Sequence, residues 1–572
     1  MTQTTMTATE SPESDIAVPI TAAELSLLHL DPSVGAGNFA FKALAVSRDP
    51  EQPILHSLDS QTLAKGLEVD SLSLTQLTVH AEQWAHWYRS NDVGEHDVVG
   101  VYARDGLHQI LHLCALTMLG AVAAITSGAM PGDVASAHFR HLRVKGVVCS
   151  VEQQAALDDD FGADLAFCAD IETVSLLRKH DPVVPFRHSD VDPIMITHSS
   201  GTTGRPKPVT LAHGQWFHGI RDNIARQAGR TGERRVLVLP ASHNSALAFI
   251  IHSVLDGGQA LLVSTQSGAA AAAAIESFRP QSVAAFPVTH VNLALKHAGQ
   301  RDFSSVNYWI SSGDASHQKH IRRLVAQGCT VRADQTTEGS VFVDGLGSSE
   351  LGHTSFLIQH TMHSRHYGRC VGRPHRWVGA RVFDAAGRPA PDGTIGRLGV
   401  SSPSITPGYW NDSELTARSK IDGYFLTGDL TYRDSTGRFF HVDRTSDVIN
   451  TAGGPCYSLL SEEYLMTLDE IVDDCVVSAV PAGNGVQRPV AIVWSERDAQ
   501  IIADPLIENF NEALAARDMP LMHGVAVVSP DAIPRGITGK VLKCELLSAL
   551  ADVADDPAQA DWIIDYCVAD AA

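Results

Sequence analysis

The sequence predicts an α/β protein with a large amino-terminal domain of parallel-type sheets flanked by helices, a small β-rich unit, and a small α+β carboxy-terminal domain. Two observations lead to this prediction. Between about residues 75 and 345, apolar runs recur with helical patterns between them, and they are continuous rather than alternating, as in strands buried on both faces. The chain has 572 residues, which is more than one hydrophobic core usually supports.

Eight short apolar runs are predicted to be strands of the large domain. In chain order they are VVGVYA, GVVCSV, DPIMITHSS, RVLVLPA, ALLVST, SVAAFP, NYWISSG and SVFVDGLG. Several of them end in Ser- or Gly-rich turns, and loops at the carboxyl ends of such strands are where ligands bind. The most apolar long window, Leu107–Ile125, is predicted to be a buried helix, because its histidines would be costly in lipid. Gly268–Phe278 has the composition of a packing helix.

The pattern changes near residue 376, where short β-rich segments with glycine turns predict a small antiparallel unit. After HVDRTSD the chain becomes a mixture of strands and helices that continues to Ala572. We therefore divide the chain into a disordered tail (residues 1–20), an amino-terminal core (21–443) and a carboxy-terminal domain (444–572).

Composition and charge exclude several classes of protein. The chain has 43 Lys and Arg against 65 Asp and Glu, a formal net charge of -22, which argues against nucleic-acid or anionic-membrane partners. The amino terminus has neither a basic start nor an apolar block, so no signal or membrane anchor is predicted. Nine cysteines without a C-x-x-C pair favour a cytoplasmic location. HQKH (317–320) and HSRH (363–366) lack metal-site spacing and are predicted to be surface histidines.

One polar segment, ITHSSGTTGRPKPVTLAH at residues 196–213, begins at the end of a predicted buried strand. A flexible linker would be a low-complexity tract, whereas Pro206 stiffens this segment. A Walker loop is excluded because the chain contains no G-x-x-x-x-G-K-[ST] motif. Glycines that let the backbone approach an anion, several hydroxyls and the ammonium of Lys207 together favour a loop that binds phosphate.

HSSGTTGRPKP resembles the phosphate loop of the adenylate-forming (ANL) superfamily, which includes acyl-CoA synthetases, peptide-synthetase adenylation domains and firefly luciferase. Further motifs extend the resemblance, in order, over roughly residues 60 to 550. The resemblance implies that the chain binds ATP, Mg²⁺ and coenzyme A. The residues that it assigns to the phosphates are Thr197, Ser199, Ser200, Gly201, Thr202, Thr203, Gly204 and Lys207.

Three motifs in the large domain resemble the family's acid and adenylate site. PASHNSA places His243 at the mouth of the acid pocket, and ISSGDAS places Gly313 near the adenine and the acyl group. In VFVDGLGSSELGH, the hydroxyl of Ser349 would meet the adenylate phosphate and the carboxylate of Glu350 would hold Mg²⁺. The same motif assigns to the nucleotide Asp344, Gly345, Leu346 and Gly347. ADQTTEG offers a competing metal ligand, Glu338, and the sequence leaves that choice open.

Motifs near and after the predicted boundary resemble the rest of the site. Asp429 in YFLTGDL would bond both ribose hydroxyls, and Arg444 in HVDRTSDVINTAGG would contact ribose or phosphate oxygens. The hinge would lie at Ser446, where the family usually has Asp or Lys. Gly454 matches a glycine of the pantetheine path. Lys540 in PRGITGKVLKCEL would be the catalytic lysine, carried by a mobile lid domain.

The resemblance implies a carboxylic acid–CoA ligase that forms acyl-AMP and pyrophosphate, then acyl-CoA and AMP. Its catalytic residues would be Lys540, His243, Ser349 and Glu350. The wording DGLGSSE is closer to benzoate-type ligases and suggests an aryl or cyclic acid of secondary metabolism. The expected partners are this small-molecule acid and, as is common in the family, a second copy of the chain. Two alternatives stay open: an adenylating enzyme whose acceptor is a carrier protein, an amine or nitrite, and a half-reaction enzyme that works with a partner ligase and only transfers acyl from acyl-AMP to coenzyme A.

Overall fold

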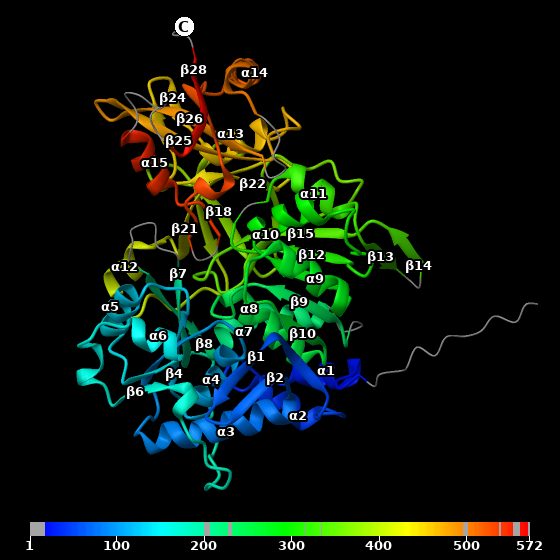
Figure 1. Cartoon of the computed structure of the whole chain (residues 1–572), viewed down its shortest axis with the longest axis vertical. Helices are drawn as coiled ribbons and strands as arrows, with labels where there is room; N and C mark the ends of the chain where they lie inside the picture. The colour runs from blue at the N-terminus through cyan, green and yellow to red at the C-terminus, as the bar shows by residue number, and fades with distance from the viewer. Residues whose placement is uncertain are drawn as a thin grey trace, which may run out of the picture.

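The computed structural model of the chain describes residues 18–199, 206–226, 231–314, 316–332, 335–495, 501–536, 539–552 and 561–569. It confirms the predicted α/β class, with two large sheets surrounded by helices and a smaller sheet formed by the carboxy-terminal part (Figure 1). Each of the eight apolar runs predicted to be strands overlaps one. Of the tail predicted over residues 1–20, residues 1–17 lie outside the described part, and Ile20 is buried.

The first large sheet has six strands in the order β6-β5-β3-β4-β7-β8. All neighbouring strands are parallel except β7 and β8. The strands are β3 (Val98–Ala103), β4 (Val122–Ser127), β5 (Gly146–Cys149), β6 (Phe167–Asp170), β7 (Pro193–Ser199) and β8 (Lys207–Ala212). The helices in this part of the chain are α3 (Leu74–Ser90), α4 (Leu107–Met118), α5 (Gly132–Leu142) and α6 (Val151–Ala156). The predicted phosphate loop therefore joins β7 to β8.

The window Leu107–Ile125 does not form one helix, so that prediction was wrong. Helix α4 ends at Met118 and β4 begins at Val122. Gly120 lies between them with a φ of +72°, and a Cβ atom there would lie 2.8 Å from the ring of Phe186. Glycine adopts this left-handed conformation without steric cost and leaves room for the ring. The apolar run is therefore divided between a buried helix and a buried strand.

The second large sheet has fourteen strands, and its parallel section lies between antiparallel pairs, which include β1–β2 at one edge. Strands β9 to β12 and β15 are parallel, and the pairs from β15–β16 onward are antiparallel. Because β17 pairs with β22, the antiparallel unit predicted from residue 376 is continuous with the large sheet rather than separate. Its strands are β1 (Pro53–Ala64), β2 (Leu67–Ser73), β9 (Arg234–Val238), β10 (Gln259–Leu262), β11 (Ser282–Ala285), β12 (Tyr308–Ser311), β15 (Val341–Gly347), β16 (Thr354–His360), β17 (Cys370–Pro374), β18 (Gly379–Phe383), β19 (Gly396–Ser401), β20 (Lys420–Ile421), β21 (Tyr424–Arg433) and β22 (Phe439–Arg444).

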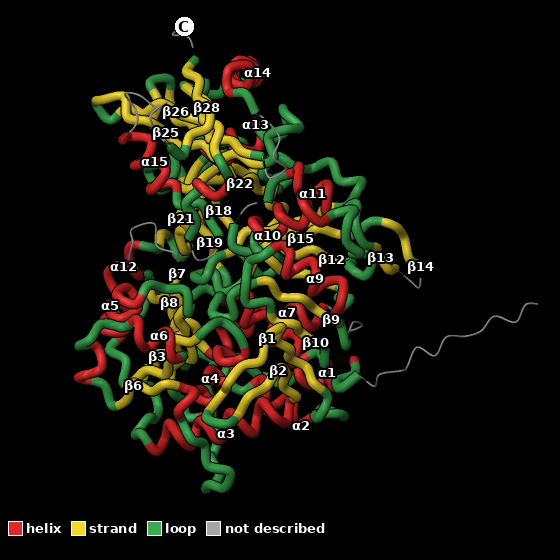
Figure 2. The backbone as a smooth tube through the Cα atoms, viewed as in Figure 1, coloured by secondary structure: helices red, strands yellow, loops and turns green. Residues whose placement is uncertain are grey.

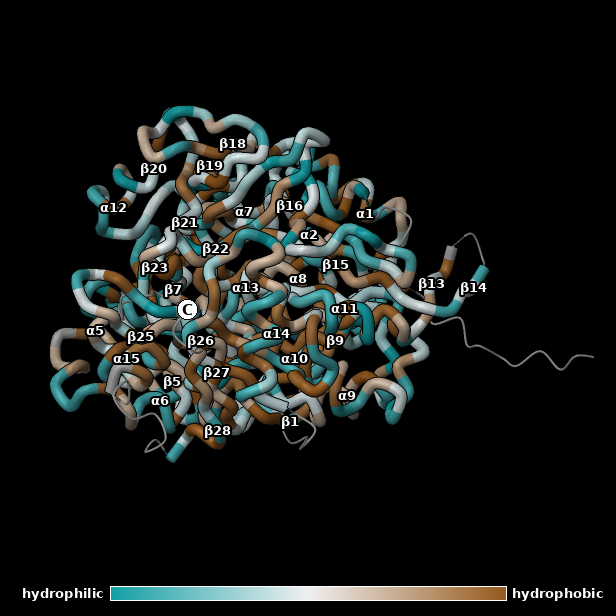
Figure 3. The backbone as a smooth tube through the Cα atoms, turned by 90° about the horizontal axis from the view of Figure 1, so that it is seen from above, coloured by the Kyte–Doolittle hydropathy of each residue, from teal (hydrophilic) through white to brown (hydrophobic). Residues whose placement is uncertain are grey.

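Helices cover this second sheet, and one hairpin projects from it. The helices are α1 (Ala22–Leu30), α2 (Phe39–Val46), α7 (His213–Arg226), α8 (Asn244–Leu255), α9 (Gly268–Phe278), α10 (Pro287–Asn292), α11 (Gln318–Val325) and α12 (Ser413–Arg418). The hairpin consists of β13 (Cys329–Arg332) and β14 (Gln335–Glu338) and extends to the right in Figure 1. Hydrophobic residues, brown in Figure 3, gather in the central strands and helices, whereas many outer loops are hydrophilic.

After β22 the chain forms a smaller unit, which lies at the top of Figure 2. Its four-stranded sheet has the order β25-β26-β27-β28. The elements are β23 (Ile449–Thr451), β24 (Gly454–Cys456), α13 (Ser458–Leu465), β25 (Asp474–Gly483), β26 (Val486–Trp494), α14 (Ala503–Ala515), β27 (Gly524–Val528), α15 (Lys543–Asp552) and β28 (Ile563–Val568). Its buried core includes Leu465, Val477 and Phe510. Within the described ranges, no helix has both the length and the apolar character required to cross a membrane.

Candidate active site

A cavity of about 1940 Å³ is lined by strand ends and loops of both large sheets and by the carboxy-terminal unit. The predicted site residues that line it are Lys207, His243, Gly313, Asp344, Gly345, Leu346, Gly347, Ser349, Glu350, Asp429, Arg444, Ser446 and Lys540. Motifs that are far apart in the sequence thus meet at one site, at the carboxyl ends of parallel strands such as β12 and β15.

The remaining predicted phosphate and pantetheine residues either do not line this cavity or lie outside the described part of the chain. Thr197 is buried within β7, and Gly454 begins β24 with a φ of +119°. Neither is among the described residues of the cavity wall. The side chain of Ser199 and the whole of Ser200, Gly201, Thr202, Thr203 and Gly204 lie outside the described part of the chain. Their phosphate-binding role therefore stays a prediction.

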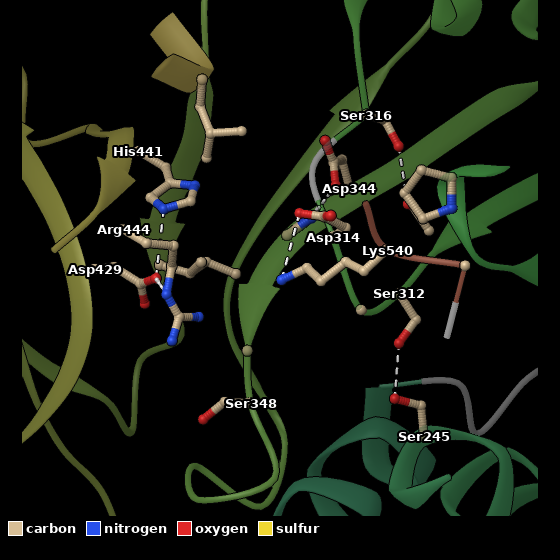
Figure 4. Close-up of a pocket in the computed structure, with 18 of the residues that line it drawn as sticks. Ser245, Ser312, Asp314, Ser316, Asp344, Ser348, Asp429, His441, Arg444 and Lys540 are labelled. Atoms are coloured by element: carbon tan, nitrogen blue, oxygen red, sulfur yellow. Dashed lines mark hydrogen bonds and ion pairs between the residues drawn. The ribbon is translucent and has the colours of Figure 1, made fainter. Parts of the chain in front are cut away.

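Lys540 reaches from the carboxy-terminal unit into the cavity. Its Nζ atom lies 3.6 Å from Oδ1 of Asp314, and each side chain is about one-third exposed (Figure 4). Gly539, the residue before it, approaches α10 closely, since a Cβ atom there would lie 2.4 Å from Val288. Gly539 also has a φ of +73°, which glycine adopts without strain. The backbone at Gly539, next to Lys540, is thereby packed against the large domain.

Asp429 and Arg444 face each other on the paired strands β21 and β22. Their closest atoms, Oδ1 and Nε, are 3.3 Å apart. His441 also lies beside this carboxylate, with 3.4 Å between its Nε2 atom and Oδ1 of Asp429. Arg369 donates a hydrogen bond to the Nδ1 atom of His441 at 3.0 Å. Burial alone would raise the pKa of Asp429, but Arg444, His441 and Thr427 hold it well below its usual range. Asp429 is therefore an anion that can accept hydrogen bonds from two hydroxyl groups.

Glu350 is held in the cavity wall by two contacts. The hydroxyl of Tyr409 donates to Oε1 at 3.1 Å, and the backbone N–H of Thr406 donates to the Glu350 carbonyl at 2.8 Å. Its second carboxylate oxygen is a hard ligand of the type that Mg²⁺ prefers, so the residue fits this metal. Glu338, the competing candidate, lies on the exposed strand β14 of the projecting hairpin and is not among the described residues that line the cavity.

His243 precedes α8 and has a local structural role besides its place in the cavity wall. Its Nδ1 atom accepts a hydrogen bond from the backbone N–H of Ser245 at 3.3 Å. Its ring stands edge-on to Phe286, with centroids 5.1 Å apart. Burial lowers the pKa of His243 to about 4, so the ring is neutral near pH 7. The hydroxyl of Ser245 lies 2.7 Å from that of Ser312 in the cavity wall (Figure 4).

Ser446, the predicted hinge, is exposed, and its hydroxyl donates to Asp447 at 2.7 Å. Behind it lies a buried cluster that the sequence analysis did not identify. Lys543 Nζ donates to Glu462 and to the hydroxyl of Ser458, both at 2.7 Å. Ser458 in turn donates to Asp443 at the end of β22. The second lysine of the GKVLK sequence was the available signal for this cluster.

Two further residues escaped the sequence analysis. Asp314 was present in ISSGDAS but was assigned no role, and it lies beside Lys540. His320, predicted to be on the surface, is only 2% exposed, whereas His363 and His366 are exposed as predicted. Among the described residues, no group of three or more His, Cys, Asp and Glu is arranged to hold a metal ion.

Comparison with known proteins gives consistent likenesses. The sequence profile of a family described as AMP-binding enzyme matches residues 44–410. A 3-aminoavenalumate diazotase from Streptomyces sp. is 34% identical over 535 residues, which cover 90% of this chain and 95% of that protein. A feruloyl-CoA synthase from Amycolatopsis sp. is 29% identical over 370 residues, which cover 64% of this chain and 71% of that protein. The crystal structure of the anthranilate CoA ligase AuaEII in complex with anthranoyl-AMP has a TM-score of 0.76 at 19% identity, covering 94% of this chain and 100% of that one.

Proposed function

The chain belongs to the AMP-binding enzyme family of the adenylate-forming superfamily, and on this premise we propose that it uses ATP to activate nitrite and transfers the nitroso group to an aromatic amine. The main observation in favour of an adenylation step is that Lys540, Glu350 and Asp429 line the same cavity. The likeness to a diazotase over nearly the whole length of both chains supports nitrite and an amine as the reactants. The likeness to feruloyl-CoA synthase extends over less than two-thirds of this chain.

Adenylation must bring two anions together, an oxyanion and the α-phosphate of ATP. Lys540 would neutralise the charge that builds on the phosphate oxygens during in-line attack. Asp429 would hold the ribose hydroxyls, with Arg444 on the neighbouring oxygens. Glu350 would hold Mg²⁺, which supplies further positive charge to the phosphates. A nitrite oxygen then bonds to the α-phosphorus as pyrophosphate leaves, which gives a mixed anhydride of nitrite and AMP.

In the second step, the amine nitrogen would attack the nitrogen of this anhydride. AMP leaves with the electron pair of the broken N–O bond, and the amine releases a proton. The resulting N-nitrosamine then loses hydroxide to become an aryl diazonium ion. The cavity serves this step because its walls are continuous from the Lys540 end to α7 and α8, so a second substrate can enter beside the nucleotide.

An acid–CoA ligase, as the sequence analysis favoured, is the second candidate. Gly454 supports it, because no described residue other than its two chain neighbours has an atom within 4 Å of the position that a Cβ would take there, as an open pantetheine path requires. The relatives that are named as CoA ligases support it too. Both candidates share the adenylation step and differ in the oxyanion and in the acceptor.

Pyrophosphate release separates the two candidates. The full chain would be incubated with ATP, Mg²⁺ and 3-aminocinnamate, with or without nitrite and with or without coenzyme A. We expect release that depends on nitrite, together with a diazonium product that is trapped as an azo dye by a coupling reagent. Pyrophosphate release that does not depend on nitrite, with a thioester formed only when coenzyme A is present, would favour the second candidate instead.

A further inference from the structure

The cavity wall also includes a polar group of residues from helices α7 and α8 and from the loop before β16. Ile220, Asn223 and Arg226 follow each other at three-residue spacing on α7 and all line the cavity. His252 lines it from α8, and His353 lines it from the loop before β16. Only His353 belongs to an adenylate-forming motif, VFVDGLGSSELGH, and that motif assigns it no role. We call this group the α7 end of the cavity.

A chain of hydrogen bonds orders the α7 end. Burial lowers the pKa of His353, so its ring is neutral near pH 7. Its Nδ1 atom lies 3.0 Å from the carbonyl of Thr354 and therefore carries the proton. Nε2 is then an acceptor, and Asn223 donates to it at 3.1 Å. Arg226 donates to the Asn223 oxygen at 2.8 Å, so the amide and the guanidinium are both held in place.

The charged groups around Asp222 on α7 leave a positive excess. Arg226 and Arg376 share one carboxylate, that of Asp222, at 2.9 and 3.1 Å. Two guanidinium groups are thus balanced by a single anion. Arg235 also lines this end, but its charge is taken up by Asp256 at 2.5 Å and by Glu233 at 3.3 Å. The Arg226 side chain is 44% exposed and remains accessible from the cavity.

A buried polar atom in the same wall has no protein partner. His252 is 8% exposed, and among the described residues its Nε2 atom has no hydrogen-bond partner. Leaving such an atom unpaired in a buried wall costs free energy unless a ligand satisfies it. The stretch of wall toward Ser245 is apolar and includes Ile220, Ala248 and Phe249. Apolar side chains of this kind suit contact with an aromatic ring, and a polar substituent on that ring would satisfy His252.

We propose that the α7 end binds the carboxylate of an aromatic amino acid whose amine faces Lys540. The guanidinium of Arg226 and the amide of Asn223 would donate to the carboxylate oxygens, and His252 would donate through Nε2. The inference rests on the proposed function, since it requires that the carboxylate is recognised rather than activated. It makes the α7 end a specificity site for substrates that carry an acid at one end and an amine at the other.

The test compares two ligands that differ only in charge. Binding of 3-aminocinnamate and of its carboxamide to the full chain would be measured by calorimetry without ATP, so that the result does not depend on turnover. We expect the acid to bind about tenfold more tightly than the amide or better, as for charge-assisted pairs. Arg226→Gln should abolish this preference and Arg226→Lys should restore part of it. AMP binding in the same samples checks that each variant is folded.

Arg376→Gln is the matched control, because it removes the other guanidinium that contacts Asp222 and does not belong to the cavity wall among the described residues. It should keep the preference for the acid. A preference that survives Arg226→Gln and disappears in Lys540→Ala would overturn the inference, since the carboxylate would then lie at the nucleotide end. Equal binding of the two ligands, or binding of neither at millimolar concentration, would overturn it as well. Absence of nitrite-dependent pyrophosphate release would instead reject the proposed function. The binding measurements would still show whether the α7 end recognises a carboxylate.

Discussion

His317 and Glu463 form an ion pair that joins the large domain to the carboxy-terminal unit, with 2.8 Å between Nδ1 and Oε2. The pair lies where α11 begins and α13 approaches its end. Lys319 and His320 add contacts with backbone carbonyls of the same unit, including those of Asp469 at 2.9 Å and Asp473 at 2.8 Å. The HQKH sequence is therefore a docking site for the carboxy-terminal unit in the arrangement that brings Lys540 into the cavity.

This pair predicts a pH-dependent contribution to stability. Burial alone would lower the pKa of His317, but Glu463 raises it above 6.5, and the pKa of Glu463 is lowered from 4.5. The histidine contribution is complete below pH 6.5 and is lost as pH rises through the raised value, and the glutamate contribution is lost in acid. The pair should therefore stabilise the protein most between pH 4.5 and 6.5.

We expect Glu463→Gln to lower the free energy of unfolding by roughly 2–4 kcal/mol near pH 6 and by clearly less near pH 9. Thermal melts of the full chain at both pH values measure the difference. Glu508→Gln, an exposed glutamate on α14, serves as the control. Equal destabilisation by Glu463→Gln at the two pH values would show that the charge on His317 is not involved.

Lys540→Ala should remove adenylation and spare the later step. Without the ammonium, the charge that develops on the α-phosphate is not neutralised, and pyrophosphate release should fall by roughly 100-fold or more. Transfer from a pre-formed adenylate should continue, because the lysine acts only on the attack at phosphorus. Lys420→Ala, an exposed lysine elsewhere in the chain, should match the wild type. Equal loss of both steps in Lys540→Ala would contradict the assigned role.

Separate substitution of Glu350 and Glu338 tests which of the two glutamates binds Mg²⁺. Glu350→Gln should raise the Mg²⁺ concentration needed for half-maximal pyrophosphate release by roughly tenfold or more, because it removes a hard anionic ligand. Glu338→Gln makes the same chemical change on the exposed β14 and should leave this concentration unchanged. Metal titrations of the two variants provide the measurement. A shift in Glu338→Gln alone would move the metal site to the projecting hairpin.

Some features of the fold could be predicted from sequence because they depend on local patterns. The runs VVGVYA and SVAAFP are continuous and apolar because their strands are buried on both faces of a sheet. The helix predicted over Leu107–Ile125 failed at one residue, Gly120, whose φ and close contact depend on the distant Phe186. Apolar periodicity does not record such a contact, so the change from helix to strand was not visible.

Some residues of the candidate site could likewise be predicted from the sequence, whereas others could not. Residues such as Asp429 and Glu350 could be found because each stands in a recognisable motif, and both line the cavity. The α7 end could not be found, because Asn223 and His353 are 130 residues apart and meet only through the packing of α7 against the loop before β16. Single histidines and arginines carry no signal of the partners that tertiary structure gives them.

The buried cluster behind the hinge predicts a non-additive effect on stability. Burial raises the pKa of the Glu462 carboxyl, and the Lys543 ammonium, 2.7 Å away, opposes that change. Lys543→Met would leave the charges of Glu462 and Asp443 without a cation in a buried site. We expect the free energy of unfolding to fall by about 3–5 kcal/mol.

Removing the charge on both partners should cost less than removing the lysine alone. In the double variant Lys543→Met with Glu462→Gln, Asp443 is the carboxylate of the cluster that loses its cation. Ser458 still donates hydrogen bonds to it. The double variant should therefore recover about 1–3 kcal/mol relative to Lys543→Met, as measured by urea denaturation of the full chain. Lys420→Met, at an exposed position, should change stability by less than about 0.5 kcal/mol. A double variant no more stable than Lys543→Met would mean that the Lys543 ammonium acts through Ser458 and Asp443 rather than through Glu462.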